Sequence, residues 1–278
     1  MEQSEERERE QLPATLRAFF QRLYRDPRYV LLDKIERFGR ERLAYMETST
    51  LLSPTGEVRG QAHLSQEYMR NGRPDGDRPY GEDSILDHLS RNRSGDVVEL
   101  SDDDLAVLRD ESWQYYVRRN FCFLLEDYYQ AREDAEHNLG ICDLIGRSNA
   151  GDAAKWSYVR WWPWIERDRA IAQAMSDLAQ GEAEEAATGL YRAQRAIEQF
   201  GGKHAEQYGE DEGENEDLCS HMRQHIGILV DLLRRDRDLP VSLEERFDQA
   251  AAEGNRAEMD RIRGEMIRRA VDVGDEIE

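Results

Sequence analysis

The fold is decided by residues 101–145, which read SDDDLAVLRDESWQYYVRRNFCFLLEDYYQAREDAEHNLGICDLI. Apolar and small residues recur there at alternating intervals of four and three, namely Val117, Phe121, Leu124, Tyr128, Ala131, Ala135, Asn138, Cys142 and Ile145. This spacing is typical of a stripe along one face of an α-helix. Ser101, with Asp104 three residues later, supplies a helix start. We therefore expect one continuous helix over 101–145, about 60 Å long at about 1.5 Å per residue.

A helix of that length predicts a scaffold on which shorter helices dock. The expected fold is therefore all-α, with a long central helix, packed antiparallel helical hairpins and a further hairpin at the C-terminus. The stripe of the long helix leaves a second arrangement open, a coiled-coil homodimer. In that dimer Asn138, at a core position, would fix the register of the two helices.

The composition excludes several classes of protein. The 278 residues include 38 basic and 59 acidic side chains, a formal net charge of −21. This acidic excess argues against direct nucleic-acid binding, which needs a basic footprint, and against docking to an anionic membrane. No apolar stretch approaches the ~20 residues of a membrane span. Three cysteines are too few for a disulfide framework, and the expected location is the cytoplasm.

The N-terminal part divides into short predicted elements. Residues 1–10 are expected to be a disordered tail, and residues 11–202 a helical domain. Within it, apolar spacing predicts helices over 12–24 and 29–45, the second from Leu32, Ile35 and Phe38. Residues 49–100 are rich in Gly, Pro and Asp and are expected to be mostly loops. The exceptions are a helix around 85–89 and a short strand at 97–100.

The C-terminal half predicts hairpins separated by a linker. Small and apolar residues over 163–200 surround a Gly turn, as in a helical hairpin of tetratricopeptide type. Residues 203–217 carry many acidic side chains and no apolar stripe, so we expect an acidic linker and a domain boundary there. Residues 218–278 then form a C-terminal helical region. Ser242 and Glu245 predict a capping box at the start of its last hairpin.

This last hairpin cannot bury its apolar residues by itself. They are Leu243, Phe247, Ala250, Ala251, Met259, Ile262, Met266 and Ile267. Hiding a few hundred Å² of apolar surface contributes several kcal/mol at roughly 25 cal/mol per Å². The stripe is therefore expected to pack either on another protein or on the preceding helix of this chain.

Residues 242–269 resemble the UVR motif, the short helical hairpin of the UvrB and UvrC repair proteins. The matching positions are Leu243, Ala250, Ile262, Arg263 and Met266, with Glu253-Gly254-Asn255 at the expected bend. The segment departs from the motif at Arg256, Asp260 and Gly264. The resemblance implies a hairpin that pairs with another helical hairpin in a partner protein, a binding role without catalysis. It covers only this part of the chain.

Three other groups of residues could bind a metal or a partner, but each also has an ordinary structural explanation. Glu133, Asp134 and His137 place carboxylates and an imidazole on one helix, as in di-metal bundles, but no second matching pair is present and an ion-pair cluster with Arg132 explains them better. Cys219, His221 and His225 supply three potential zinc ligands but lack a fourth, which favours a chance grouping at a helix start. Five aromatic side chains crowd residues 156–164, either as a binding platform or as packing between helices.

No phosphate-binding loop, nucleophile elbow or Cys-x-x-Cys pair is present in the sequence. The sequence therefore predicts a non-enzymatic adaptor without a cofactor or metal, whose partner is another protein. The partner-binding residues expected for it are Leu243, Phe247, Ala250, Met259, Ile262, Arg263, Met266, Trp161 and Trp164. The alternative is a metal-binding helical-bundle enzyme or metal carrier that uses Glu133, Asp134 and His137.

Overall fold

The computed structural model describes residues 14–24, 29–37, 40–52, 58–92, 97–208 and 212–275. The predicted tail, 1–10, lies outside them. Ten α-helices are described: α1 Ala14–Leu23, α2 Ile85–Asn92, α3 Asp102–Leu124, α4 Tyr128–Gly146, α5 Asp152–Val159, α6 Trp162–Ala179, α7 Ala183–Tyr208, α8 Glu212–Arg237, α9 Leu243–Ala252 and α10 Arg256–Asp275. The chain is predominantly helical, which confirms the all-α fold class. Every helix of the described residues is too short or too polar to cross a membrane.

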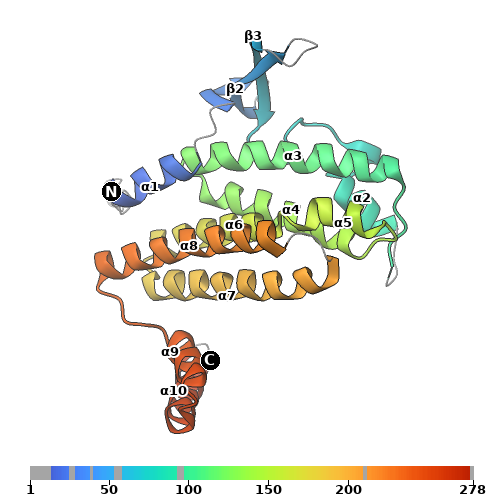
Figure 1. The fold of residues 1–278 in the computed structure, drawn as a ribbon. Helices are drawn as coiled ribbons and strands as arrows, with labels where there is room; N and C mark the ends of the chain where they lie inside the picture. Colours follow the sequence, from blue (N-terminus) through green and yellow to red (C-terminus); the bar gives the residue numbers. More distant parts are fainter. Residues whose placement is uncertain are drawn as a thin grey trace, which may run out of the picture.

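The layers follow one another from the sheet to the C-terminus (Figure 1). A small sheet lies beyond α3, and α4 and α6 lie on the other side of α3. The next layer is made of α7 and α8, and the α9–α10 pair projects beyond it. We call everything up to α8 the body and the α9–α10 pair the C-terminal hairpin.

The expected long helix is wrong, because 101–145 forms two helices, α3 and α4, packed against each other. The chain reverses at Leu125–Asp127, where Glu126 adopts φ 58°. Asp127 then caps α4 by accepting a hydrogen bond from the amide of Gln130. No Pro or Gly marks this turn, so the sequence pattern runs through it unbroken. The predicted start is confirmed, since Ser101 and Asp104 form a capping box.

The stripe itself is real, and it marks the inward face of both helices. Most of its members are buried: Val117, Phe121, Ala131, Ala135, Asn138, Cys142 and Ile145. Asn138 donates a hydrogen bond to the carbonyl of Ser112 on α3 at 3.2 Å. The stripe is therefore covered within one chain, and the seam expected for a coiled-coil homodimer is not exposed.

The predicted helix over 29–45 is also wrong, because this segment forms strands β1 (Tyr29–Arg37) and the start of β2 (Arg40–Leu52). With β3 (Val58–Met69) they make an antiparallel sheet of order β1-β2-β3, and the end of β2 and all of β3 lie in the region 49–100 that was expected to be mostly loops. Leu43 and Tyr45 are two residues apart and both buried. Tyr45 packs on Phe121 of α3 at 5.1 Å between ring centroids. Contact with α3 thus selects the two-residue period over the helical spacing of Leu32, Ile35 and Phe38.

Both short helices predicted in this region are confirmed, and the short strand is confirmed only in part. Helix α1 lies within the predicted 12–24, and α2 contains the predicted 85–89. The strand expected at 97–100 is reduced to a single bridge between Val98 and Ser148.

The acidic linker expected over 203–217 is instead helical at both ends, since α7 extends to Tyr208 and α8 begins at Glu212. Only residues 209–211 lie outside the description. The two helices pack together, and α8 buries Met222, Ile226 and Leu229 in the main apolar cluster. The body therefore extends to Arg237, and the boundary falls at 238–242. The helices continue through this charged segment because α8 buries an apolar face from Cys219 onward.

The interior of the body contains paired charges as well as apolar side chains. Arg118 is buried and donates from Nε and Nη2 to the two carboxylate oxygens of Asp134, at 2.9 and 2.6 Å. Its Nη1 donates to the carbonyl of Met69 at the end of β3. Its neighbour Arg119 pairs with Asp168 of α6 at 2.9 Å. These contacts join the sheet, α4 and α6 to α3.

We predict that Asp134→Ala destabilises the protein by about 3–5 kcal/mol, because it leaves the buried Arg118 without its carboxylate. Urea denaturation followed by far-UV circular dichroism measures the change. Glu133→Ala is the matched control, since Glu133 is adjacent and half-exposed, and it should change the free energy of unfolding by about 0.5 kcal/mol at most. Equal losses in the two variants would contradict the structural importance of the buried pair.

Candidate interaction surface on the C-terminal hairpin

The C-terminal hairpin follows its sequence prediction, except that only the Ser242 half of the predicted capping box forms. Ser242 caps α9 by accepting a hydrogen bond from the amide of Glu245 at 3.2 Å. Gly254 takes the left-handed conformation at the bend, with φ 68°. Asn255 then caps α10 through the amide of Glu258. The carboxylate of Glu245 is used elsewhere, in an ion pair with Arg234 of α8.

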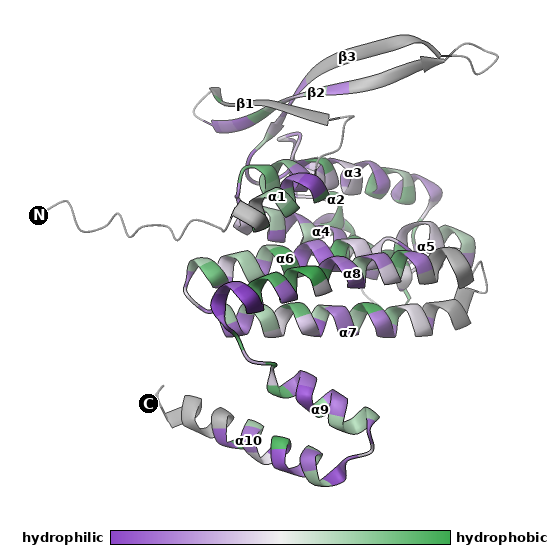
Figure 2. Ribbon diagram, turned by 60° about the vertical axis from the view of Figure 1, so that its left-hand side comes forward, coloured by the Kyte–Doolittle hydropathy of each residue, from purple (hydrophilic) through white to green (hydrophobic). Residues whose placement is uncertain are grey.

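Few of the hairpin's apolar side chains are buried by this fold. Ala250 and Ile262 are fully enclosed between the two helices. Leu243, Phe247, Met259 and Met266 are half-buried, and Ile267 is 59% exposed. Among the described residues, neither helix contributes a side chain to the apolar clusters of the body. Figure 2 shows the hairpin as mostly hydrophilic.

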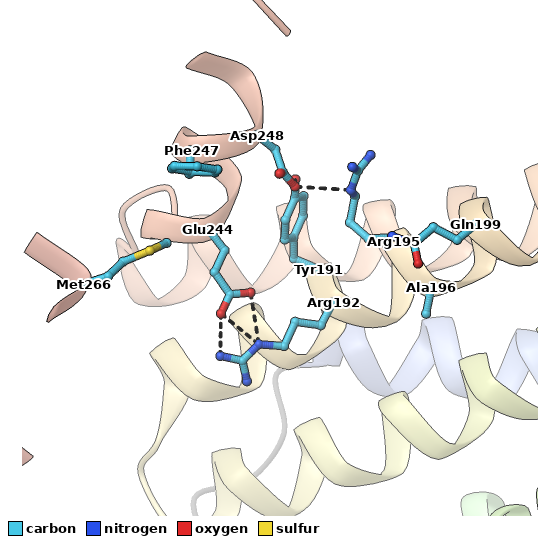
Figure 3. A pocket seen from close by; sticks show the side chains of 9 residues that line it. All are labelled: Tyr191, Arg192, Arg195, Ala196, Gln199, Glu244, Phe247, Asp248 and Met266. Atoms are coloured by element: carbon cyan, nitrogen blue, oxygen red, sulfur yellow. Dashed lines mark hydrogen bonds and ion pairs between the residues drawn. The ribbon is translucent and has the colours of Figure 1, made fainter. Parts of the chain in front are cut away.

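Polar contacts hold the hairpin on α7. The hydroxyl of Tyr191 donates to Asp248 at 2.7 Å, and Arg195 pairs with the same carboxylate at 3.2 Å. Arg192 donates to both oxygens of Glu244 at 2.6–3.0 Å (Figure 3). Burial, the hydrogen bond to Asp248 and its negative charge together raise the pKa of Tyr191, so its hydroxyl stays protonated and donates.

A hollow of about 340 Å³ remains between the hairpin and α7. Phe247 and Met266 line it from the hairpin, and Tyr191 and Ala196 from α7 (Figure 3). The guanidinium of Arg263 lies 5.7 Å from the ring centroid of Phe247. We call this space the hairpin hollow. The hairpin hollow lies between the apolar side chains of the hairpin and those of α7. The hairpin therefore contacts the body through the polar groups around this hollow.

The predicted residues of this surface come together only in part. Leu243, Phe247, Ala250, Met259, Ile262, Arg263 and Met266 all belong to one hairpin. Trp161 and Trp164 lie at the start of α6, beside Trp162, which stacks on Phe200 near the other end of α7. Trp164 packs half-buried against the core and over Arg167, whereas Trp161 is 45% exposed. The two tryptophans are therefore not part of the hairpin surface.

Sequence reasoning missed the residues that seat the hairpin, which are Tyr191, Arg192, Arg195 and Arg234. Their signal in the sequence is weak. Tyr191 and Arg195 are four residues apart on a helix whose opposite face is made of small and apolar side chains. Polar residues on such an outer face are usually solvated, so the sequence does not show that these two contact another helix. Only the fold brings Glu244, Glu245 and Asp248 to them.

The three residues of the metal alternative do not converge. Both oxygens of Asp134 are engaged by Arg118, and Gln130 donates to one of them. Glu133 pairs with Arg132, as the ion-pair interpretation expected. His137 turns to α3, where its ring stacks on Tyr115 at 3.7 Å. No group of three potential metal ligands occurs among the described residues.

The second candidate metal group is also dispersed. Cys219 is buried, and burial raises the pKa of its thiol. His221 contacts the carbonyl of Asp217 in its own helix. His225 faces Arg167 at 3.2 Å, and burial together with that cation lowers its pKa.

A buried carboxylate that the sequence analysis did not single out anchors the segment before α3. Glu111 accepts hydrogen bonds from the amides of Ile85 and Leu86, at 2.9 and 3.1 Å. It also accepts from Arg73 and contacts Nε2 of His137, both at 3.0 Å. Burial alone would raise the pKa of Glu111, but the His137 contact and the two amides outweigh it and lower the pKa.

We predict that Glu111 makes stability depend on pH in the acid range. Its pKa is lower in the folded chain than its ordinary value of 4.5, so its contribution is complete above 4.5 and is lost as the pH falls through the lower folded value. Glu111→Gln should cost about 1–3 kcal/mol at neutral pH and flatten the acid-side slope. Urea denaturation across the acid range measures both, with exposed Glu136→Gln as control. A slope unchanged by Glu111→Gln would refute this assignment.

We also predict that Arg192→Glu loosens the hairpin while the body stays folded, because it places two carboxylates opposite each other. Exposed ion pairs contribute about 0.2–1 kcal/mol each, so the loss is local. Hydrogen exchange should become several-fold faster in α9 and stay unchanged in α3. High salt should have the same effect on the unmodified chain. The control, Arg235→Glu, changes an exposed cation of α8 by the same charge. Equally faster hydrogen exchange of α9 in this control would overturn the specific role of Arg192.

Comparison with family models, with curated proteins and with solved structures gives no match to this chain.

Proposed function

We propose that this chain is a non-enzymatic adaptor whose C-terminal hairpin binds another protein. The observation that carries the proposal is the contrast between the hairpin's fold and its burial. Its helices, caps and bend are formed, yet among the hairpin side chains that the structure describes, 243–268, only Ala250 and Ile262 are enclosed. Larger apolar side chains, above all Ile267, are left accessible on a unit that polar contacts hold in place.

The kind of partner follows from the same surface. Burying one exposed aliphatic side chain of this size contributes about 1.5–3 kcal/mol, so a facing helix pair would gain from covering Ile267 and the rim of Phe247 and Met266. The resemblance of 242–269 to the UVR motif supports such a pairing of hairpins. The cytoplasmic location expected from the cysteines remains a prediction.

A pull-down with three chains tests the proposal. The bait proteins are the full chain, the chain ending at Pro240, and the full chain with Ile267→Asp. Quantitative mass spectrometry of proteins recovered from extracts of the source organism should show a partner that both altered chains lose by about tenfold or more, because a buried aspartate opposes association.

The matched control is Ile228→Asp, which places the same change on a 41% exposed isoleucine of α8. It should retain the partner. Equal recovery of every protein by the full chain and by the chain ending at Pro240 would remove the hairpin from the mechanism.

A further inference from the structure

A second hollow, of about 450 Å³, lies at the other end of α7. Its apolar walls come from Val159, Trp162 and Phe200, with Cys142 of α4 beside them. The rings of Trp162 and Phe200 stack with centroids 5.0 Å apart and planes 5° from parallel. We call this space the tryptophan hollow. Its aromatic walls are braced by contact with each other and with the body, so the shape is preformed.

The two hollows adjoin, because Ala196 and Gln199 line both. The residues that α7 contributes to the pair of hollows lie on one face of the helix: Tyr191, Arg192, Arg195, Ala196, Gln199, Phe200 and Lys203. From Tyr191 to Lys203 the helix rises about 18 Å. In Figure 3 Gln199 lies at the opposite end of the hairpin hollow from Met266. Together the hollows make a groove along α7, closed at one end by the C-terminal hairpin and at the other by α4 and α6.

The charge of this groove differs from that of the chain as a whole. The chain carries a net charge of −21. The groove is lined by four cations and three carboxylates, namely Arg147, Arg192, Arg195 and Lys203 against Asp143, Glu244 and Asp248. The three arginines are paired with acids. Lys203 is exposed and lines the aromatic end of the groove, and among the residues whose side chains the structure describes, which do not include 204–216, it has no carboxylate partner.

We propose that this groove binds an acidic amphipathic helix of a partner protein. About 12 residues, three turns, match its length. A large apolar side chain of that helix would enter the tryptophan hollow, and a carboxylate one turn away would pair with Lys203. Helices lie in grooves in this way through side chains spaced three and four apart. The groove shares Phe247 and Met266 with the hairpin but does not include Ile267, and most of its lining comes from the body, so the inference goes beyond the adaptor role proposed above.

The test uses the full chain and two synthetic peptides of about 15 residues. Both carry leucines at helical three-and-four spacing, one with glutamates and the other with lysines at the flanking positions, and both carry a fluorescein label. Fluorescence anisotropy should show about tenfold tighter binding of the glutamate peptide. The net charge of the chain favours the opposite order, so this preference reports the groove rather than bulk attraction. Tighter binding of the lysine peptide would overturn the proposal.

Two variants locate the binding. Gln199→Trp fills the region that the hollows share, and Lys203→Glu reverses the charge of the groove's lysine; both positions are exposed, so folding should be unaffected. Each should weaken glutamate-peptide binding about tenfold. The matched controls on α8 are Gln224→Trp and Arg235→Glu, at exposed positions that line neither hollow, and they should have no effect. Equal weakening by variants and controls would overturn the assignment.

Two further measurements distinguish the groove from the hairpin surface and from self-association. Ile267→Asp should leave peptide binding unchanged, so a failed groove and a failed hairpin surface give different results. Light scattering of the free protein tests a second copy as the occupant. A dimer that Gln199→Trp dissociates would assign the groove to self-association and overturn the proposal of a partner helix.

Discussion

Two consecutive buried arginines of α3 hold the body together. Successive residues of a helix point about 100° apart, so Arg118 and Arg119 reach different layers. Arg118 binds Asp134 of α4 and the end of β3, and Arg119 binds Asp168 of α6. In a continuous helix Arg118 and Asp134 would be about 24 Å apart. Their pairing therefore requires the turn at 125–127, and the packing of α4 and α6 follows from it.

Buried charges of this kind do more to select one arrangement than to stabilise it. Removing an arginine and its carboxylate from water costs several kcal/mol per ion, which good geometry repays only in part. Asp168 constrains three groups at once, since Arg167 and the hydroxyl of Tyr24 also donate hydrogen bonds to the carboxylate that pairs with Arg119. A slip of α1 or α6 would leave these groups unpaired. We infer that the register of the helices depends on these pairs.

Helix α7 links the interior to the two candidate binding surfaces. One face buries Ala186, Leu190, Ala193 and Ile197 in the main apolar cluster. The other seats the C-terminal hairpin and lines both hollows. Because the inner face is packed, the outer face is held rigid. The hairpin, by contrast, rests on partly exposed ion pairs, which are weak and sensitive to salt. The body thus offers a preformed groove, while the hairpin is free to exchange its contacts.

The sequence by itself determined the helical class, the caps at Ser101 and Ser242, and the bend at Gly254, because caps and bends depend on neighbouring residues. It also identified most of the apolar residues of 101–145 that face inward, although Leu124 is 37% exposed and the buried charges Arg118, Arg119 and Asp134 lay outside the predicted stripe. Tertiary structure alone decided that this stretch turns at Glu126, that Leu43 and Tyr45 lie on a strand, and that the acidic residues after 203 continue two helices. It alone decided the seat of the hairpin and the groove. These features depend on contacts between residues far apart in the chain, such as Arg118 with Met69 and Tyr191 with Asp248, for which local spacing carries no signal.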